Sequence, residues 1–268
     1  MMAVLVAMTM PLPAMSQMDI LGDYDYDGRV NVSDVTALIS YVLTGSWDDM
    51  PQVESETVLV NGVPLVMVHV EGGSFTVDEA TYNVPGFWIG QTEVTNALYK
   101  AVMEPSSAAG GSETAQSSVS YNQWLSFITA LCQQTGMEFR LPKLSEWRFA
   151  ALGGNRSSGY TYPGSDNHMK VAWSKNNPPN PYGYEPSSAK KVAQLKCNEL
   201  GLYDMGGNVG EFCTSGSDVY YCGGSFKVAG EQCVYTNAIK HPNGMWNTKY
   251  AFMGVRLVLP EEALPLGK

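Results

Sequence analysis

The sequence predicts an α+β fold in which irregular loops outweigh helices and strands. Charged residues make up only 16% of the 268 residues, whereas glycine (27), tyrosine (15) and proline (15) are plentiful. This composition favours a loop-rich fold over a helical bundle. Short runs of β-forming residues recur from Val58 onward, and later segments carry apolar residues at helical spacing. The net charge of −10 argues against a nucleic-acid partner.

Residues 1–17 are apolar, uncharged and too short to span a membrane. They end in Ala14-Met15-Ser16, where small residues flank a larger one, as at the cleavage site of a secretory signal peptide. A buried N-terminal strand is the alternative, because the basic start of a signal peptide is missing. No other segment is long and apolar enough to cross a membrane, so we expect a secreted, periplasmic or cell-surface protein.

Residues 18–46 carry the pattern of a calcium-binding loop followed by a helix. Oxygen-bearing side chains alternate along the loop, and Gly28 permits the sharp bend that brings them to one centre. These side chains belong to Asp23, Asp25, Asp27, Asn31 and Asp34. Apolar residues then follow at helical spacing from Val35 to Leu43. The pattern predicts an EF-hand-like calcium loop, with an acidic surface turn as the alternative. The polar and acidic residues 47–57 are typical of a linker.

Short β-forming runs begin the main domain. We expect strands over 57–60, 65–70 and 74–77, with a glycine turn before the last of them, and a further strand over 87–90. A closing strand is predicted over 252–259.

Three helices are predicted between these strands. The first covers 97–103 and is capped by Thr92 or Thr95. The second ends at Gly136 and has an apolar stripe made of Tyr121, Trp124, Leu125, Ile128, Leu131 and Cys132. The third begins at Lys143 or Ser145, after Pro142 has stopped a strand, and ends at Gly153. Residues 155–193 show almost no periodicity and are predicted to form a long loop.

The five cysteines are Cys132, Cys197, Cys213, Cys222 and Cys233. In an exported protein they permit one or two disulfides and leave at least one thiol, and the sequence does not fix the pairing. Cys132 lies on the apolar helical stripe and is predicted to be a buried thiol.

The stretch from Gly201 to Phe212 must bend sharply, because Gly206, Gly207 and Gly210 permit positive φ angles. Its curved backbone and the side-chain oxygens of Asn208 and Glu211 suit a hard cation. A tight core turn with a surface carboxylate is the alternative.

Five collinear motifs give the main domain its family resemblance. They are Glu71-Gly-Gly-Ser-Phe-Thr, Gln91-Thr-Glu-Val-Thr-Asn, Arg140-Leu-Pro with Glu146-Trp147, Gly201-Leu-Tyr-Asp-Met with Gly207-Asn-Val, and Gly223-Gly-Ser-Phe with Gly254-Val-Arg. Together they resemble the formylglycine-generating enzyme, or sulfatase-modifying factor, superfamily. The resemblance covers about 65–259, within an expected domain of 58–260 followed by a tail, 261–268. It implies a C-type-lectin-like variant of the α+β fold, with long loops and bound calcium.

The N-terminal loop resembles a single dockerin repeat. The resemblance implies that calcium is held by Asp23, Asp25, Asp27, the Arg29 carbonyl and Asp34, with Asn31 acting through water. Dockerins bind cohesin modules, so the implied partner is cohesin-like, or else a surface of the same chain.

The superfamily resemblance also assigns metal sites in the main domain. It implies calcium ligands at the carbonyls of Gly207 and Val209 and at the Glu211 side chain. The family's oxidases bind copper(I) through two cysteines, and soft thiolates suit that metal. The second cysteine corresponds to Cys233, but the first corresponds to Val228, which cannot ligate copper. Glu93 and Arg256, both in family motifs, are expected to form buried ion pairs.

These observations leave three functional hypotheses. The first is a secreted bacterial, non-catalytic binding protein that recognises a protein or glycan through the segment 226–252. Its candidate contacts are Tyr235, Asn237, His241, Asn243, Trp246, Asn247 and Tyr250, although the aromatic residues could instead fill the domain's own core. The second is an oxidase acting on a thiol substrate through Cys233 with copper. The third is a structural module of a surface assembly, joined through the dockerin-like segment.

Overall fold

The computed structural model describes residues 53–105, 111–176 and 188–265. The predicted signal peptide (1–17), the dockerin-like segment (18–46) with its calcium ligands, and residues 47–52 of the predicted linker lie outside the described residues. No helix among the described residues is long and apolar enough to cross a membrane.

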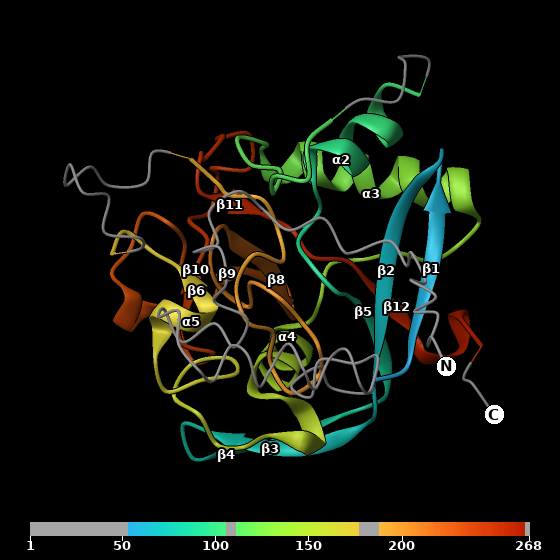
Figure 1. The fold of residues 1–268 in the computed structure, drawn as a ribbon. Coiled ribbons are helices and arrows are strands. Elements are labelled where there is room, and N and C mark those ends of the chain that lie inside the picture. Colours follow the sequence, from blue (N-terminus) through green and yellow to red (C-terminus); the bar gives the residue numbers. More distant parts are fainter. Residues whose placement is uncertain (1–52, 106–110, 177–187, 266–268) are drawn as a thin grey trace, which may run out of the picture. The chain divides into compact units, whose positions relative to one another are not determined.

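The first sheet has four antiparallel strands in the order β1-β2-β5-β12 (Figure 1). The strands are β1 (Ser55–Val60), β2 (Val63–Val70), β5 (Phe87–Gly90) and β12 (Val258–Pro260). Asn61 and Gly62 form the turn between β1 and β2, and both have positive φ (50° and 84°), as a tight hairpin of this type requires. β1 begins at Ser55, so the last residues of the predicted linker belong to a strand.

A separate hairpin, β3 (Gly73–Val77) and β4 (Ala80–Val84), follows β2. The strand predicted over 74–77 is thus confirmed, and β5 coincides with the strand predicted over 87–90.

Helices α2 (Asn96–Met103) and α3 (Tyr121–Thr135) cover one face of this sheet (Figure 1). Thr95 caps α2, and it is one of the two capping residues that the sequence predicted. Ser120 and Gln123 form a capping box at the start of α3, and Gly136 ends it in the left-handed conformation.

The predicted apolar stripe of α3 was wrong at one position. Leu125 is 41% exposed, whereas Phe127 is fully buried between Trp124 and Tyr99. Helical spacing permits either residue on the buried face, and packing against α2 selects Phe127.

The other face of the sheet packs against α4 (Leu144–Leu152), which begins after Lys143 and ends at Gly153 as predicted. The segment that follows contains short elements only: a 3-10 turn (Gly154–Arg156), α5 (His168–Val171) and β6 (Ala172–Trp173). The prediction of a mainly irregular segment therefore agrees with the described part of it.

The second sheet has the order β10-β9-β8-β11. Its strands are β8 (Gly210–Ser215), β9 (Asp218–Cys222), β10 (Ala238–Lys240) and β11 (Met253–Gly254). A short parallel pair joins β6 to β7 (Gly206–Gly207). Two further 3-10 turns cover Gly230–Gln232 and Glu261–Ala263.

The single closing strand predicted over 252–259 was wrong. The segment splits into β11, which runs parallel to β8, and β12, which runs antiparallel to β5. The residues between them pass from one sheet to the other, and Arg256 lies fully buried at this crossing.

Candidate functional site

The stretch 201–212 is bent, but of Gly206, Gly207 and Gly210 only Gly207 has the positive φ that was expected. Asp204, Gly207 and Asn208 have φ angles of +56°, +81° and +47°. Only glycine fits at position 207, because a Cβ there would collide with the backbone of Trp173. The bend ends at Gly210, where β8 begins and carries Glu211 into the interior.

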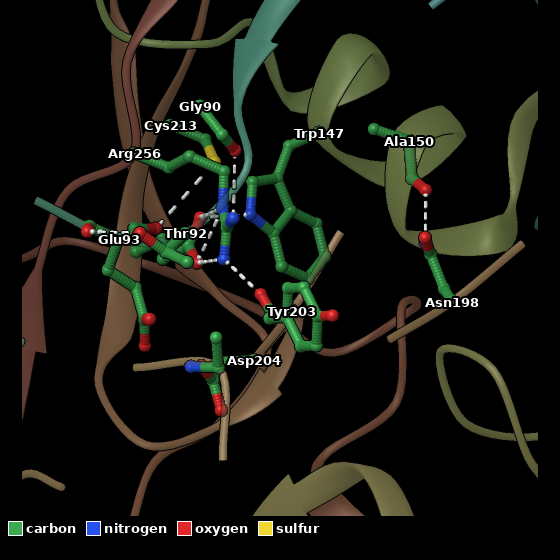
Figure 2. Close-up of polar contacts among 12 residues, drawn as sticks. Gly90, Thr92, Glu93, Trp147, Ala150, Asn198, Tyr203, Asp204, Cys213 and Arg256 are labelled. Carbon is green, nitrogen blue, oxygen red and sulfur yellow. Dashed lines mark hydrogen bonds and ion pairs between the residues drawn. The ribbon is translucent and has the colours of Figure 1, made fainter. Parts of the chain in front are cut away.

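A buried ion pair joins Glu211 to Arg256 beside this stretch, and Figure 2 labels Arg256 among the surrounding residues Trp147, Tyr203 and Asp204. The Arg256 Nε donates to Glu211 Oε1 and Oε2 at 3.0 and 3.1 Å, and Nη2 donates to Oε1 at 2.8 Å. The indole N–H of Trp147 donates to Glu211 Oε2 at 2.6 Å. Arg256 also donates to the carbonyls of Gly90 (2.9 Å) and Tyr203 (2.7 Å). One arginine therefore ties β5, β8 and the bent stretch to the crossing between the sheets.

Arg256 pairs with Glu211 and not with Glu93, although both carboxylates lie nearby. Both carboxylate oxygens of Glu93 and Oδ1 of Asp204 are buried without a hydrogen-bond partner among the described residues. Burial, followed by the nearby Asp204 charge, raises the pKa of Glu93 well above its ordinary value. Burial also raises the pKa of Asp204 to about 6, although the Ala193 N–H bonds its other oxygen at 2.7 Å.

This arrangement bears on the calcium ligands predicted at Gly207, Val209 and Glu211. The two oxygens of the Glu211 carboxylate already accept four hydrogen bonds from Arg256 and Trp147, so in this arrangement neither oxygen is free to bind a cation. The unpartnered oxygens belong instead to Asp204 and Glu93. The described residues contain no group of three acidic, histidine or cysteine side chains placed to hold a metal. Calcium at this stretch remains a prediction.

The position that the family resemblance assigns to a copper site contains one thiol, that of Cys233. Cys233 follows the 3-10 turn 230–232 and lies close to Gly224, to which Val228 is also near. Cys233 is fully buried, and its Sγ lies 3.9 Å from the Ala229 carbonyl oxygen. Burial raises the pKa of this thiol to about 12, so at neutral pH it is a thiol and not the thiolate that binds metal or attacks substrates.

The candidate recognition residues fall into two groups. Asn243 and Asn247 are exposed, and Asn247 accepts a hydrogen bond from Asn122 of α3 at 2.9 Å. The aromatic residues are half-buried: Trp246 and Tyr250 pack on the core beneath α3, and Tyr235 packs on the core around α4. Asn237 is also half-buried and donates to the Gln232 carbonyl at 2.6 Å.

His241 explains why Trp246 and Tyr250 turn inward. Its ring is buried and stacks on Trp246, with centroids 5.1 Å apart. Phe212, Tyr121 and Tyr250 surround it at 5.5, 6.3 and 6.1 Å. Neither ring nitrogen has a partner among the described residues. The sequence pointed to His241 as a candidate contact, but only the fold reveals that it anchors the segment.

Both ends of the segment 226–252 are attached to the bent stretch. The Phe226 N–H donates to the Asn208 carbonyl at 2.9 Å, and the Gly210 N–H donates to the Phe252 carbonyl at 2.8 Å. The exposed residues in between therefore lie on a loop that closes on a rigid base.

Known proteins share this domain. The protein "Chaperone protein LppX" of Paenibacillus barcinonensis is 28% identical over 200 residues, which cover 55% of this chain and 70% of the relative. Treponema denticola variable protein 1 has the same fold, with a TM-score of 0.64, 21% identity and coverage of 77% of this chain and 99% of that one. The crystal structure of CarF gives a TM-score of 0.62 at 26% identity, with coverage of 74% and 99%.

PvdO from Pseudomonas aeruginosa shares the fold as well, with a TM-score of 0.58, 16% identity and coverage of 74% and 95%. The family described as "Sulfatase-modifying factor enzyme 1-like domain" matches residues 54–260, in agreement with the five collinear motifs. The chain therefore belongs to the sulfatase-modifying factor, or formylglycine-generating enzyme-like, family.

Proposed function

We propose that this protein is a non-catalytic binding protein that uses its sulfatase-modifying factor-like domain to present a recognition surface from the segment 226–252. The observation that carries this proposal is the state of the two thiol positions. Val228 occupies the first, and the thiol at the second, Cys233, is buried and protonated. A two-thiolate copper site needs two ionisable sulfurs, and this position supplies neither.

The recognition surface consists of Asn243, Met245, Asn247 and the neighbouring Asn122 of α3. All four side chains are exposed, and Met245 is 41% exposed although it is apolar. Amides give adaptable hydrogen bonds, and methionine gives a deformable apolar contact, a combination suited to binding another macromolecule. Trp246 and Tyr250 support this surface from beneath, because they stack on or around His241.

The ligand is a protein or a glycan. The relative named as a chaperone favours a protein ligand for this chain. We further propose that the protein acts outside the cytoplasm, as its apolar start at residues 1–17 suggests. The dockerin-like segment would then serve as a calcium-stiffened spacer or as the attachment to a larger surface assembly.

A copper titration tests the non-catalytic proposal. Reduced protein is titrated with copper(I) against a chromogenic chelator, beside the variants Cys233→Ser and Cys132→Ser. We expect no stoichiometric high-affinity binding that depends on Cys233. Tight binding that Cys233→Ser abolishes and Cys132→Ser retains would instead support the oxidase hypothesis.

A binding screen against proteins and glycans tests the surface itself. Asn243→Ala and Asn247→Ala should weaken the interaction without lowering the melting temperature, whereas Asn83→Ala, an exposed amide on β4, is the matched control. Equal effects of the control and the loop variants would contradict the assignment of the surface.

A further inference from the structure

Two cysteines that the proposed function does not use lie together inside the domain. Cys213 is on β8 and Cys222 is on β9, and the two strands pair antiparallel. Cys213 lies opposite Tyr220, and Cys222 lies opposite Glu211. The two cysteines are therefore on the same face of the hairpin, at diagonal positions, because Cys222 lies two residues beyond the residue that faces Cys213.

This face points into the core. Cys213 and Cys222 are 0% and 1% exposed, and both belong to the apolar cluster that contains Trp147 and Met205. Burial raises the pKa of the Cys213 thiol well above its ordinary value, and the nearby Cys222 side chain adds to the rise. The Cys213 Sγ lies 3.6 Å from the Glu211 carbonyl oxygen, and Glu211 is the residue opposite Cys222 in the hairpin.

The other cysteines have separate surroundings. Cys132 lies on α3 and donates from its Sγ to the Phe139 carbonyl at 3.3 Å. The Cys233 Sγ lies near the Ala229 carbonyl, and the backbone carbonyl of Cys197 lies close to Gly164. Within the described chain, Cys213 and Cys222 are the only two cysteines that share a core cluster.

We propose that Cys213 and Cys222 are the redox-active pair of this chain and form a disulfide between β8 and β9. The co-reactant is a small disulfide such as glutathione disulfide. One chain thiolate displaces a thiolate from it and forms a mixed disulfide. The second chain thiolate attacks the chain sulfur of that mixed disulfide and releases the other small thiolate. The two released thiolates take up the protons given up by the chain thiols, so two electrons leave the chain and one small disulfide becomes two thiols.

Burial determines when this bond forms. A small disulfide cannot reach either sulfur in the closed fold, so exchange requires folding intermediates or opening of the hairpin. Once formed, the bond fixes the end of β9 to β8 immediately before Gly223 and Gly224. That is where the chain leaves the sheet toward Phe226, so the disulfide would hold the base of the 226–252 loop. This inference does not depend on whether the loop binds a ligand.

Peptide mapping of the full chain tests the pairing. Reduced protein is equilibrated in a glutathione redox buffer, with and without a low concentration of urea, then alkylated and digested with chymotrypsin without reduction. Cleavage after Tyr220 or Tyr221 separates the two cysteines unless a disulfide joins their peptides. We expect a linked pair of peptides containing Cys213 and Cys222, a mass lower by about 2 Da for the two lost hydrogens, and faster formation in urea.

Two variants check the pairing of Cys213 with Cys222 by different substitutions. Cys132→Ala should retain the linked pair, and the double variant Cys213→Ala/Cys222→Ala should lose both the link and any difference in melting temperature between oxidised and reduced protein. The proposal is overturned if both thiols are alkylated after equilibration in urea, if the link joins either of them to Cys197 or Cys233, or if the double variant keeps the redox-dependent shift in melting temperature.

Discussion

Replacing Arg256 tests whether the buried ion pair stabilises the junction of the two sheets. In Arg256→Met the side chain keeps its apolar stem but loses every donor to Glu211, Gly90 and Tyr203. Removing one partner of a buried pair costs about 3–5 kcal/mol, because the other charge remains buried without compensation. Two orphaned carbonyls add to this, so we expect a loss of about 4–6 kcal/mol. That is a large part of the roughly 5–15 kcal/mol that stabilises a typical domain.

The Glu211→Gln variant and the double variant Arg256→Met/Glu211→Gln measure how much of the loss comes from the interaction between the two side chains. Glu211→Gln keeps an oxygen for the Trp147 indole but leaves Arg256 without its charge partner, so we expect a loss of about 3 kcal/mol. Because the double variant removes both charges, its loss should fall short of the sum by about 2 kcal/mol.

Urea unfolding followed by tryptophan fluorescence measures these losses. The control is Lys240→Met, which removes an ion pair with Asp218 in which the two side chains are 50% and 38% exposed, and it should change the free energy of unfolding little. Losses for Arg256→Met no larger than for this control, or strictly additive losses in the double variant, would refute the assigned pairing.

Three further predictions follow from the buried titratable groups. Glu93→Gln should leave the free energy of unfolding at pH 7 unchanged or higher. Since the pKa of Glu93 is raised in the folded state, the wild type loses stability relative to this variant as pH rises above about 4.3, measurable by urea unfolding across pH. Cys233, with a pKa of about 12, should resist iodoacetamide in the folded protein and react only after unfolding, which mass spectrometry detects. Burial lowers the pKa of His241, so the unfolded chain takes up the proton first and stability falls as pH drops below about 6.5; thermal unfolding should show that His241→Asn removes this acid-dependent loss.

Local chemistry explains which elements the sequence predicted well. The cap at Thr95 and the helix ends at Gly136 and Gly153 were predicted because each depends on residues close together in the chain, whereas the turn at Asn61-Gly62 and the cap at Ser120 were not predicted. The strands and helices that these residues bound were accordingly placed within a few residues.

The predictions from sequence failed where a residue or strand contacts a partner that is distant in the chain. The segment 252–259 is continuous in its apolar pattern, but β11 pairs with β8 and β12 pairs with β5, and nothing in the segment itself reveals the change of sheet. Arg256 could be expected to bury a charge pair, yet its choice of Glu211 over Glu93 depends on how three separate segments meet. The inward turn of Trp246 depends in the same way on the buried ring of His241.

The bent stretch holds both ends of the segment that we propose as the recognition surface. Its residues Asn208 and Gly210 bond the two ends of the segment 226–252, at Phe226 and Phe252, while the next residue, Glu211, is held by Arg256. Because the hydrogen bonds at the base already close this loop, substitutions at its exposed tip should change the free energy of unfolding little. Cys233, which lies within this segment, is buried and its pKa is raised to about 12, which agrees with the proposed non-catalytic role. If the proposed function is right, substitutions at this exposed tip should change binding before they change stability.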